Sequence, residues 1–496
     1  MKICSTAQMR FLEAKTIAEK KISGSQLMEN AGKGTVDLIL DYYGDCKGKR
    51  IAVFAGPGNN GGDGFVVARH LHLLGARVTL YLLVTPDRLG HDAAFHFKLL
   101  PADLQWSTLV AEEGVAALAW QGDIIVDALL GTGLNRQVSG IFKRVIEFIN
   151  NAELPVVAVD IPSGLNADSG SLWGSCVKAA LTATYGLVKS GLVQYPGVDY
   201  VGQLEVDDIG IPPEVVAQAG INSFSIIKEV AASFLPPRKS MDHKGSHGHV
   251  LVVAGSRGKT GAALLAGAGA LRSGAGLVSL CVPERLNSIF EGHCLEAMTL
   301  PLAGLGGYAL ANSDYGAIAR AAGNKRSLVV GPGLGTAPET AALVNQLVRH
   351  LSQPLVLDAD ALNALDLESL VPERGKRVRI ITPHPGEMAR LTGLSSTEIQ
   401  NDRLQVAAAF AREHGVIVVL KGAATVIAGP DDRLAVNSSG NPGMGSGGMG
   451  DVLAGVIAGL VAQNVEPFQA VCLAVYAHGL AGDILAETGP YGYLAS

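Results

Sequence analysis

The sequence has few cysteines, few charged residues and few aromatic residues. Its six cysteines lie far apart in 496 residues and form no C-x-x-C pair, so neither a zinc knuckle nor a disulfide framework is indicated. A reducing cytoplasm is the simplest location for such a chain. Lysine and arginine (39) are fewer than aspartate and glutamate (45), and the formal charge is −6. Because clustered basic residues are missing, we expect no binding to nucleic acid.

Long hydrophobic runs are also missing. Residues 1–21 carry charges throughout and lack the apolar stretch of a signal peptide. The most apolar late segment, residues 451–463 (DVLAGVIAGLVAQ), begins with a carboxylate and is shorter than the ~20 residues of a membrane span. We expect this segment to form a buried helix, and we expect no membrane partner for the protein.

Glycine, by contrast, is abundant. The chain has 62 glycines, about one residue in eight, against an average near ~7%. Short runs rich in valine, isoleucine and leucine recur with helix-like segments between them, which is typical of parallel β-α-β units. The expected strands are 51–55, 78–83, 123–127, 156–161, 250–255, 277–282, 328–331, 354–358, 379–382 and 416–421.

A segment without periodicity separates the two sets of strands. It contains the run FLPPRKSMDHKGSHGH and then leads into a fresh strand. We therefore expect an α/β protein with two domains, residues 1–225 and 226–496. Three histidines in this stretch, His243, His247 and His249, have no acidic or cysteine partners, so a loop is favoured over a metal site.

A glycine-rich turn follows the first strand. Residues 56–64 read GPGNNGGDG, and Gly56, Gly58 and Gly61 satisfy G-x-G-x-x-G between a strand and a helix. Such a turn lets the backbone approach a pyrophosphate, which the N-terminus of the following helix attracts. The carboxylate that binds a ribose, expected about ~20 residues further on, is poorly placed. The alternative is a tight turn with asparagine in the left-handed conformation.

Two other strands of the first half end in carboxylates. Asp127 precedes a glycine-rich loop, and Asp160 precedes the turn that contains Ser163. Because the C-terminal ends of parallel strands line one crevice, these three residues and Asn60 are expected to converge there. Oxygen ligands gathered in this way could hold a cation, and a carboxylate beside it could exchange protons with a substrate. For each aspartate alone, the alternative is a helix N-cap.

The second half has its own glycine-rich loop. Residues 441–451 read NPGMGSGGMGD and precede the apolar helix. Free N–H groups and the helix dipole suit a polyphosphate, and Asp451 is placed to take a proton from a substrate hydroxyl. A capping aspartate in a flexible loop is the alternative. The run GSRGKT at 255–260 is not a Walker loop, because Val253 occupies the position of the first glycine, and we expect a helix beginning near Thr260.

One histidine has an unusual local sequence. His384 lies between two prolines in TPHPGE, directly after an expected strand. The prolines make the turn rigid, so its ring is either held for a ligand or used as a structural hydrogen-bonding group. The sequence leaves both interpretations open.

Taken together, these motifs resemble those of one family. PGNNGGDG, VDALLGTGL and VDIPSGL in the first half, and HKGSHG, GPGLG, LDADALN, TPHPGE, VVLKGAAT and NPGMGSGGMGD in the second, resemble the bifunctional NAD(P)H-hydrate repair enzymes over almost the whole chain. The resemblance implies two three-layer αβα domains. Residues 1–225 would be a Rossmann-like NAD(P)HX epimerase, and residues 226–496 a ribokinase-like, ADP-dependent (S)-NAD(P)HX dehydratase.

For the epimerase, the resemblance implies a substrate site built from two segments and one strand end. Its residues would be Asn59, Asn60, Gly61, Gly62, Asp63, Gly131, Thr132, Gly133, Leu134, Asn135, Arg136, Gln137 and Asp160. A potassium ion (K⁺) would be held by Asn60, Asp127 and Ser163. Asp160 is our candidate acid/base for interconverting the R and S epimers at the hydrated ring carbon.

For the dehydratase, the resemblance implies a hydrate site beside a nucleotide site. The hydrate would contact Ala262, Gly333, His384 and Asp451. The adenine nucleotide would contact Lys421, Gly422, Ala423, Ala424, Thr425 and Gly450. Asp451 would deprotonate the ring hydroxyl, and Mg²⁺ is implied by the polyphosphate, without an assigned ligand.

Two other functions are weighed against this one. A ribokinase-like kinase of a vitamin or sugar, fused to a Rossmann-like domain, would also use GSGGMGD, but it would release a stable phosphorylated product. A non-catalytic module that binds a partner would not need the set Asn60, Asp127, Asp160 and Ser163. For the repair enzyme we expect NADHX and NADPHX as small-molecule partners, and an assembly of identical subunits.

Overall fold

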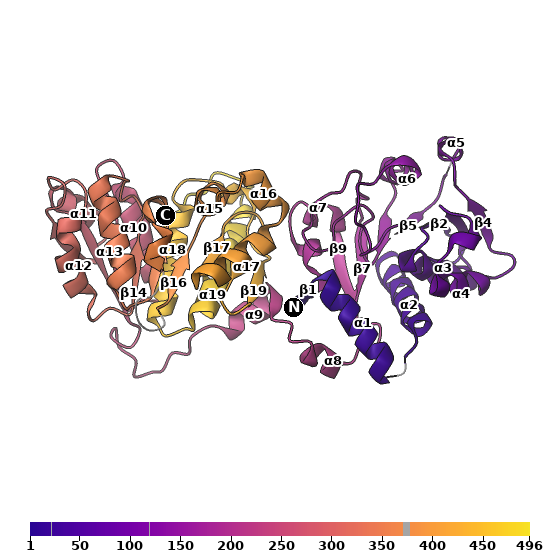
Figure 1. Ribbon diagram of the computed structural model, residues 1–496, viewed down its shortest axis with the longest axis horizontal. Coiled ribbons are helices and arrows are strands. Elements are labelled where there is room, and N and C mark those ends of the chain that lie inside the picture. Colours follow the sequence, from indigo (N-terminus) through magenta and orange to yellow (C-terminus); the bar gives the residue numbers. More distant parts are fainter. Residues whose placement is uncertain (21, 119, 371–376) are drawn as a thin grey trace. The chain divides into compact units, whose positions relative to one another are not determined.

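The structure, a computed structural model, describes residues 1–20, 22–118, 120–370 and 377–496. The chain forms two compact units (Figure 1). Lys2–Ser223 is the N-terminal unit, and Phe224–Ser496 together with Met1 is the C-terminal unit. Each unit has its own large sheet and its own hydrophobic core.

A seven-stranded parallel sheet forms the centre of the N-terminal unit. Its order is β4-β3-β2-β5-β6-β7-β9. The strands are β2 (Arg50–Ala55), β3 (Arg77–Leu82), β4 (Gln105–Thr108), β5 (Ile124–Ala128), β6 (Val156–Val159), β7 (Leu181–Tyr185) and β9 (Gln203–Asp207). The strand order reverses between β2 and β5, and ligands of such sheets bind outside the C-terminal strand ends at this switch point.

A small second sheet and eight α-helices complete the N-terminal unit. The small sheet pairs β1 (Ile3–Cys4) with β8 (Val188–Lys189) in parallel. The helices are α1 (Thr6–Lys20), α2 (Gly24–Tyr43), α3 (Asn59–Leu73), α4 (His91–Lys98), α5 (Glu112–Ala116), α6 (Gly140–Asn151), α7 (Val198–Val201) and α8 (Pro213–Gln218).

Helices cover both faces of this sheet (Figure 1). Along β2, Ile51 and Val53 belong to a core cluster that also contains residues of α1, α2 and α3. The alternate residues Ala52 and Phe54 belong to a second cluster with residues of α6. Successive side chains of a strand point to opposite faces, so the two clusters lie on the two sides of the sheet. The unit therefore has three layers.

The glycine-rich segment after β2 enters a helix at once. α3 begins at Asn59, and neither Asn59 nor Asn60 has a positive φ. The alternative of a tight turn with left-handed asparagine is therefore wrong. The helix can begin here because a Cβ on Gly61 would lie 2.0 Å from the carbonyl oxygen of Gly56, a distance that only glycine permits.

A ten-stranded sheet forms the centre of the C-terminal unit. Its order is β10-β19-β18-β17-β16-β15-β14-β11-β12-β13. The strands are β10 (Ser223–Ile226), β11 (His249–Val253), β12 (Leu277–Pro283), β13 (Met298–Leu302), β14 (Ser327–Val330), β15 (Leu355–Leu357), β16 (Arg379–Ile381), β17 (Ile417–Leu420), β18 (Val426–Ala428) and β19 (Leu434–Asn437). The sheet is parallel from β13 to β17, while the β17–β18 and β18–β19 pairs are antiparallel.

Helices pack on this sheet as well. They are α9 (Lys228–Ser233), α10 (Thr260–Arg272), α11 (Asn287–His293), α12 (Tyr315–Ala322), α13 (Pro338–His350), α14 (Asp360–Ala364), α15 (Pro385–Thr392), α16 (Ser396–Asn401), α17 (Arg403–His414), α18 (Met449–Ala462) and α19 (Pro467–Ala486). Val250 and Val252 of β11 share a core cluster with α10, α18 and α19. Leu251 and Val253, on the opposite face, are fully buried too.

This architecture confirms the predicted α/β class with mostly parallel sheets. All ten predicted strands are present, α10 begins at Thr260, and the apolar segment after the glycine-rich loop is the buried helix α18. All six cysteines are free. His249 is not in a loop as predicted but begins β11, where its Nε2 lies 2.9 Å from the Ser279 Oγ. The described residues contain no group of three or more His, Cys, Asp or Glu that could hold a metal.

One helix is long and apolar enough to cross a membrane. Within the described part of the chain this is α19, and half of its most apolar window is buried inside the C-terminal unit. Core helices of soluble proteins share these properties, so α19 alone is weak support for a membrane span.

Candidate active sites

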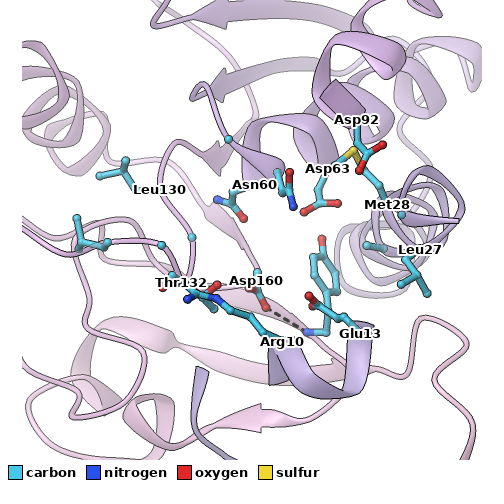
Figure 2. A pocket seen from close by; sticks show the side chains of 18 of the residues that line it. Arg10, Glu13, Leu27, Met28, Asn60, Asp63, Asp92, Leu130, Thr132 and Asp160 are labelled. Atoms are coloured by element: carbon cyan, nitrogen blue, oxygen red, sulfur yellow. Dashed lines mark hydrogen bonds between the residues drawn. The ribbon is translucent and has the colours of Figure 1, made fainter. Parts of the chain in front are cut away.

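A cavity of about 640 Å³ lies at the C-terminal strand ends of the N-terminal unit (Figure 2). Its wall is formed by the first turn of α3, the loop after β5, the end of β6, and residues of α1 and α2. This is the switch point between β2 and β5, where the sheet topology favours a ligand site.

Most predicted residues of the epimerase substrate site line this cavity. They are Asn59, Asn60, Asp63, Gly131, Thr132, Gly133, Leu134, Asn135, Arg136 and Asp160. Gly61, Gly62 and Gln137 do not line it. Gly61 packs against the backbone of Gly56, and a Cβ on Gly62 would lie 2.5 Å from the Met28 sulfur. Both glycines allow close packing of α3 and do not contribute to the cavity wall.

Asp160 projects from the end of β6 into the cavity (Figure 2). Its backbone has a φ of 62°, a conformation that aspartate tolerates better than most residues. The Asp160 Oδ1 accepts hydrogen bonds from the Lys189 Nζ (2.5 Å), the Thr184 Oγ1 (3.2 Å) and the Tyr185 N–H (3.3 Å). Asp160 caps no helix, so the N-cap alternative is wrong for this residue.

Asp127 and Ser163 form a buried hydrogen-bonded pair behind the cavity. The Ser163 Oγ donates to the Asp127 Oδ1 at 2.6 Å, and the Ser163 N–H donates to the Asp127 Oδ2 at 2.8 Å. Burial raises the pKa of Asp127 to about 6, although the bonds from Ser163 oppose the rise. Asp127 lies within β5, so the N-cap alternative is wrong here too.

The Asn60 side chain is buried in this region without hydrogen-bond partners in the described part of the chain. Both polar atoms of its side chain are buried and have no hydrogen-bond partner among the described residues. Its side chain packs against Gly131, and the neighbouring Leu130 exchanges hydrogen bonds with the Ser163 Oγ. An unpaired buried amide is costly, so the Asn60 oxygen is suited to a ligand or cation.

Several charged cavity residues were not found from the sequence. Arg10 and Glu13, which line the cavity, come from α1. Lys189 comes from β8 and contacts the cavity residue Asp160 from behind. Burial, and then the charges of Asp160 and Glu13, raise the pKa of Asp63 well above its usual value. The only sequence signal for Lys189 was its place inside the apolar run GLVKSG. The sequence of α1 has an ordinary mixture of charged and apolar residues, which gives no indication that Arg10 and Glu13 line a site.

The C-terminal unit gathers a second set of charged residues at its strand ends. The Lys421 Nζ, after β17, lies 2.9 Å from the Asp358 Oδ1, after β15, and 3.9 Å from the Glu387 Oε2. A Cβ on Gly450 would lie 3.1 Å from the Lys421 Nζ. Burial, and then the charge of Asp358, raise the pKa of Asp451 to about 6, while Lys421 opposes the rise. Asp358 and Glu387 were not predicted as site residues.

The predicted hydrate residues Ala262 and Gly333 lie together. A Cβ on Gly333 would be 3.1 Å from the Ala262 Cβ. Lys259, just before α10, contacts the same glycine and pairs with the Asp360 Oδ2 at 2.8 Å. The negative charge of Asp360 also contributes to the raised pKa of Asp451. Asp360 therefore lies near both Lys259 and the charged residues around Lys421.

Asp451 is not a helix cap. α18 begins at Met449, and its N-cap is Gly448, which adopts a φ of 92°. Asp451 is therefore the third helical residue, and among the described residues its carboxylate has no hydrogen-bond partner. This leaves the carboxylate available to a ligand beside the N–H groups of the glycine-rich loop.

His384 caps α15 through one ring nitrogen. The Nδ1 accepts hydrogen bonds from the backbone N–H groups of Gly386 (3.0 Å) and Glu387 (3.3 Å). The backbone N–H of His384 donates in turn to the Glu387 Oε2. More than half of the side chain is exposed, and the Nε2 lies 3.6 Å from the Glu387 Oε1. The structural role is thus filled by Nδ1, while Nε2 faces solvent beside the Lys421 group.

Two substitutions separate these roles of His384. The Asn Oδ1 corresponds in position to the His Nδ1, so His384→Asn should keep the cap and remove only the Nε2. We expect His384→Ala to lower the free energy of unfolding by about 1 kcal/mol and His384→Asn to change it by much less. Urea unfolding of both variants measures this difference, and equal losses would contradict the capping role.

Two family models match the chain. The model described as YjeF-related protein N-terminus matches residues 24–191. The model described as NAD(P)H-hydrate dehydratase matches residues 250–496.

Curated relatives match nearly the full length of the chain. A bifunctional NAD(P)H-hydrate repair enzyme Nnr from Moorella thermoacetica is 42% identical over 494 residues, which is 98% of this chain and 93% of the relative. The enzyme of the same name from Escherichia coli K12 is 37% identical over 476 residues, 95% of this chain and 87% of the relative. Among solved structures, the ADP/ATP-dependent NAD(P)H-hydrate dehydratase from Bacillus subtilis, co-crystallised with ATP/Mg²⁺, is 33% identical and covers 56% of this chain and 95% of its own, with a TM-score of 0.49.

Proposed function

This chain belongs to the family of bifunctional NAD(P)H-hydrate repair enzymes, and we propose that each of its two units carries one of two repair reactions. The N-terminal unit epimerises the R and S forms of NADHX and NADPHX. The C-terminal unit dehydrates the S form to NADH or NADPH at the expense of ADP. The observation that carries this assignment is the presence of a separate carboxylate-bearing site at the strand ends of each unit.

In the N-terminal unit, Asp160 is the proposed acid/base. Its carboxylate lies at the cavity wall beside Asp63 and Asn60 (Figure 2). A carboxylate there can accept and return the proton that moves when a bond to the hydroxyl-bearing carbon breaks and re-forms on the other face of the ring. The loop of residues 131–137 and the first turn of α3 would bind the rest of the nucleotide, with backbone N–H groups directed at phosphate.

The residues proposed to hold potassium fit a monovalent cation. Asn60 supplies a buried amide oxygen without a partner, and Asp127 and Ser163 supply further oxygens. Their formal charge is at most one, which suits a weakly hydrated monovalent ion better than a small divalent one. When bound, the ion would neutralise negative charge near the substrate and order the loop after β5.

Epimerisation should therefore depend on potassium more than dehydration does. We expect the rate of R-to-S conversion to be severalfold higher in potassium than in tetramethylammonium at equal ionic strength, because the organic cation is too large for the site at Asn60. Dehydration of pure S hydrate in the same buffers is the internal control. Equal epimerisation rates in the two salts would contradict the potassium site.

In the C-terminal unit, Asp451 is the proposed base. Hydroxide is a poor leaving group, so a phosphoryl group is first transferred from ADP to the ring hydroxyl, which leaves AMP. Phosphate is then expelled, and the adjacent ring carbon loses a proton as the double bond forms. Asp451 takes the hydroxyl proton, and the N–H groups of residues 445–450 stabilise the charge of the migrating group. Lys421 binds the phosphates beside Gly450. Magnesium, when bound, would neutralise the polyphosphate.

A single assay tests the proposed function. The protein is incubated with a mixture of R and S hydrates, ADP and potassium, while the absorbance of reduced nicotinamide is followed. Conversion of both epimers to NADH supports two activities, and conversion of half of the mixture supports dehydration alone. A stable phosphorylated metabolite without recovered NADH would instead identify a small-molecule kinase. A cytoplasmic location and an assembly of identical subunits remain predictions.

A further inference from the structure

Lys189 is an almost fully buried cationic side chain close to the cavity residue Asp160. Only 1% of its side chain is exposed. Its backbone lies in β8, which pairs with β1 in the register Cys4 to Lys189. The Ser190 hydroxyl also donates to the Cys4 carbonyl. The segment containing β1 lies before residue 24, where the matched family model begins, yet it holds Lys189 in place.

Every donor of the Lys189 ammonium group is used. It donates to the Asp160 Oδ1 at 2.5 Å, to the Tyr185 carbonyl oxygen at 2.7 Å and to the Thr184 Oγ1 at 3.1 Å. An ammonium group has three donors, so none is left for a substrate. Lys189 cannot therefore bind a ligand without losing one of these bonds, and its action is directed at Asp160.

The contacts of Asp160 are unequal at its two oxygens. Oδ1 accepts all three hydrogen bonds, from Lys189, Thr184 and Tyr185. Among the described residues, Oδ2 accepts none. At the end of β6 the Ile161 N–H donates to the Val159 carbonyl oxygen, and the Asp160 side chain lies at the cavity (Figure 2). One oxygen is thus fixed by the protein and the other is left for the cavity.

We propose that Lys189 is a positioning residue of the epimerase, which holds the Asp160 carboxylate in one orientation so that its free Oδ2 meets the substrate. This inference rests on the proposed role of Asp160 as the acid/base. Lys189 itself touches no substrate. Preorganised charges and hydrogen bonds of this kind contribute to rate because they need no rearrangement during the reaction.

The other charges around Asp160 make this cation necessary. Asp63 of α3 and Glu13 of α1 are acidic and share the cavity, Tyr185 of β7 is neutral, and Arg10 of α1 is cationic but exposed to solvent. Like charges in one buried site oppose ionisation. Removing Lys189 would leave Asp160 among acidic neighbours without the buried cation that contacts it.

The test compares Lys189→Met with the wild-type full-length protein. At pH 7 we expect kcat for R-to-S conversion to fall about 10²-fold or more, with little change in KM. We expect the acid limb of the rate profile to move to higher pH, because the buried cation beside the carboxylate is lost, so that activity recovers partly as the pH is raised. A lysine with a merely structural role would lower the amount of folded protein but would not move the pH profile.

Two further variants make the result decisive. Lys20→Met removes a lysine of α1 that pairs with Glu214 on the surface, and it should leave epimerisation unchanged. Thr184→Val keeps the shape of the side chain but removes its hydrogen bond to Asp160 and the acceptor of one Lys189 hydrogen bond. It should shift the profile in the same direction by less, and it serves if Lys189→Met fails to fold. Dehydration of S hydrate by the C-terminal unit monitors protein quality.

These experiments distinguish failure of the role of Lys189 from failure of the proposed epimerase function. Wild-type activity with an unshifted profile in both Lys189→Met and Thr184→Val would overturn the positioning role alone. A wild-type protein without epimerisation would overturn the proposed function and this inference with it.

Discussion

Asp451→Ala should eliminate ADP-driven dehydration while ADP still binds. The loss of a general base typically lowers a rate about 10²- to 10⁴-fold. Binding should persist because it rests on backbone N–H groups of the glycine-rich loop and on Lys421, which pairs with Asp358 and not with Asp451. Removing a carboxylate near an anionic ligand should leave ADP affinity unchanged or slightly improved.

The structure excludes a helix-capping role for Asp451. Because Gly448 and not Asp451 occupies the N-cap of α18, Asp451→Ala should cost little stability beyond its interaction with the helix dipole, about 0.3–1 kcal/mol. Asp432→Ala, at an exposed hairpin position that pairs with Arg412, is a matched control, since exposed ion pairs contribute little. Turnover near that of the wild type in folded Asp451→Ala would remove the catalytic role. Lost ADP binding would show that the loop itself had collapsed.

The same residue sets an expected pH dependence. A base acts only when deprotonated, and burial beside Asp358 raises the pKa of Asp451 to about 6. Dehydration should therefore be fully active above this value and should decline as the pH falls through about 6, rather than near the ordinary aspartate pKa of about 3.9. The measurement is kcat for S hydrate at saturating ADP from pH 5 to 8.

Asp160→Asn should abolish epimerisation and leave dehydration of the S hydrate intact. The amide keeps the size of the side chain but cannot accept a proton, so the loss should again be about 10²- to 10⁴-fold. The two reactions are separable because Asp160 and Asp451 belong to units with separate cores. The assay follows R-to-S conversion and S dehydration on the same preparation.

A second aspartate of the same cavity provides the control. Asp92 lines the cavity near Gly24, and a third of its side chain is exposed. Asp92→Asn removes the same charge from the same cavity without touching Asp160, so it should leave kcat within a few fold of the wild type. Near-normal R-to-S conversion in Asp160→Asn would exclude Asp160 from the mechanism, and equal losses in both variants would indicate an effect of cavity charge alone.

Short-range sequence patterns were sufficient to predict the strands and the carboxylates at their C-terminal ends. The segments 51–55, 124–126 and 156–159, which lie in β2, β5 and β6, are apolar at every position because both sheet faces are covered. Asp127 and Asp160 could be placed at one edge because parallel strands end on the same side. These features depend on residues within a few positions of each other, so the sequence alone contains them.

The conformations of turns and helix caps were harder to predict from the sequence. The glycine-rich segment after β2 does not form a turn with left-handed asparagines, because the small Gly61 lets α3 begin against Gly56. His384 could be either a ligand or a structural group, and its Nδ1 proved to cap α15. Competing local conformations differ by about 1 kcal/mol, and neighbouring elements decide between them.

The sequence by itself determined the two α/β units, their strands and the aspartates at the strand ends. Only the tertiary structure brought Lys189 to Asp160, Arg10 and Glu13 to the cavity, and Asp358 to Lys421. Lys421 and Asp358 are 63 residues apart in the chain, and Lys189 reaches its place through the pairing of β8 with β1 at the other end of the unit. Such ion pairs arise from strand order and packing, which no pattern within a short window records.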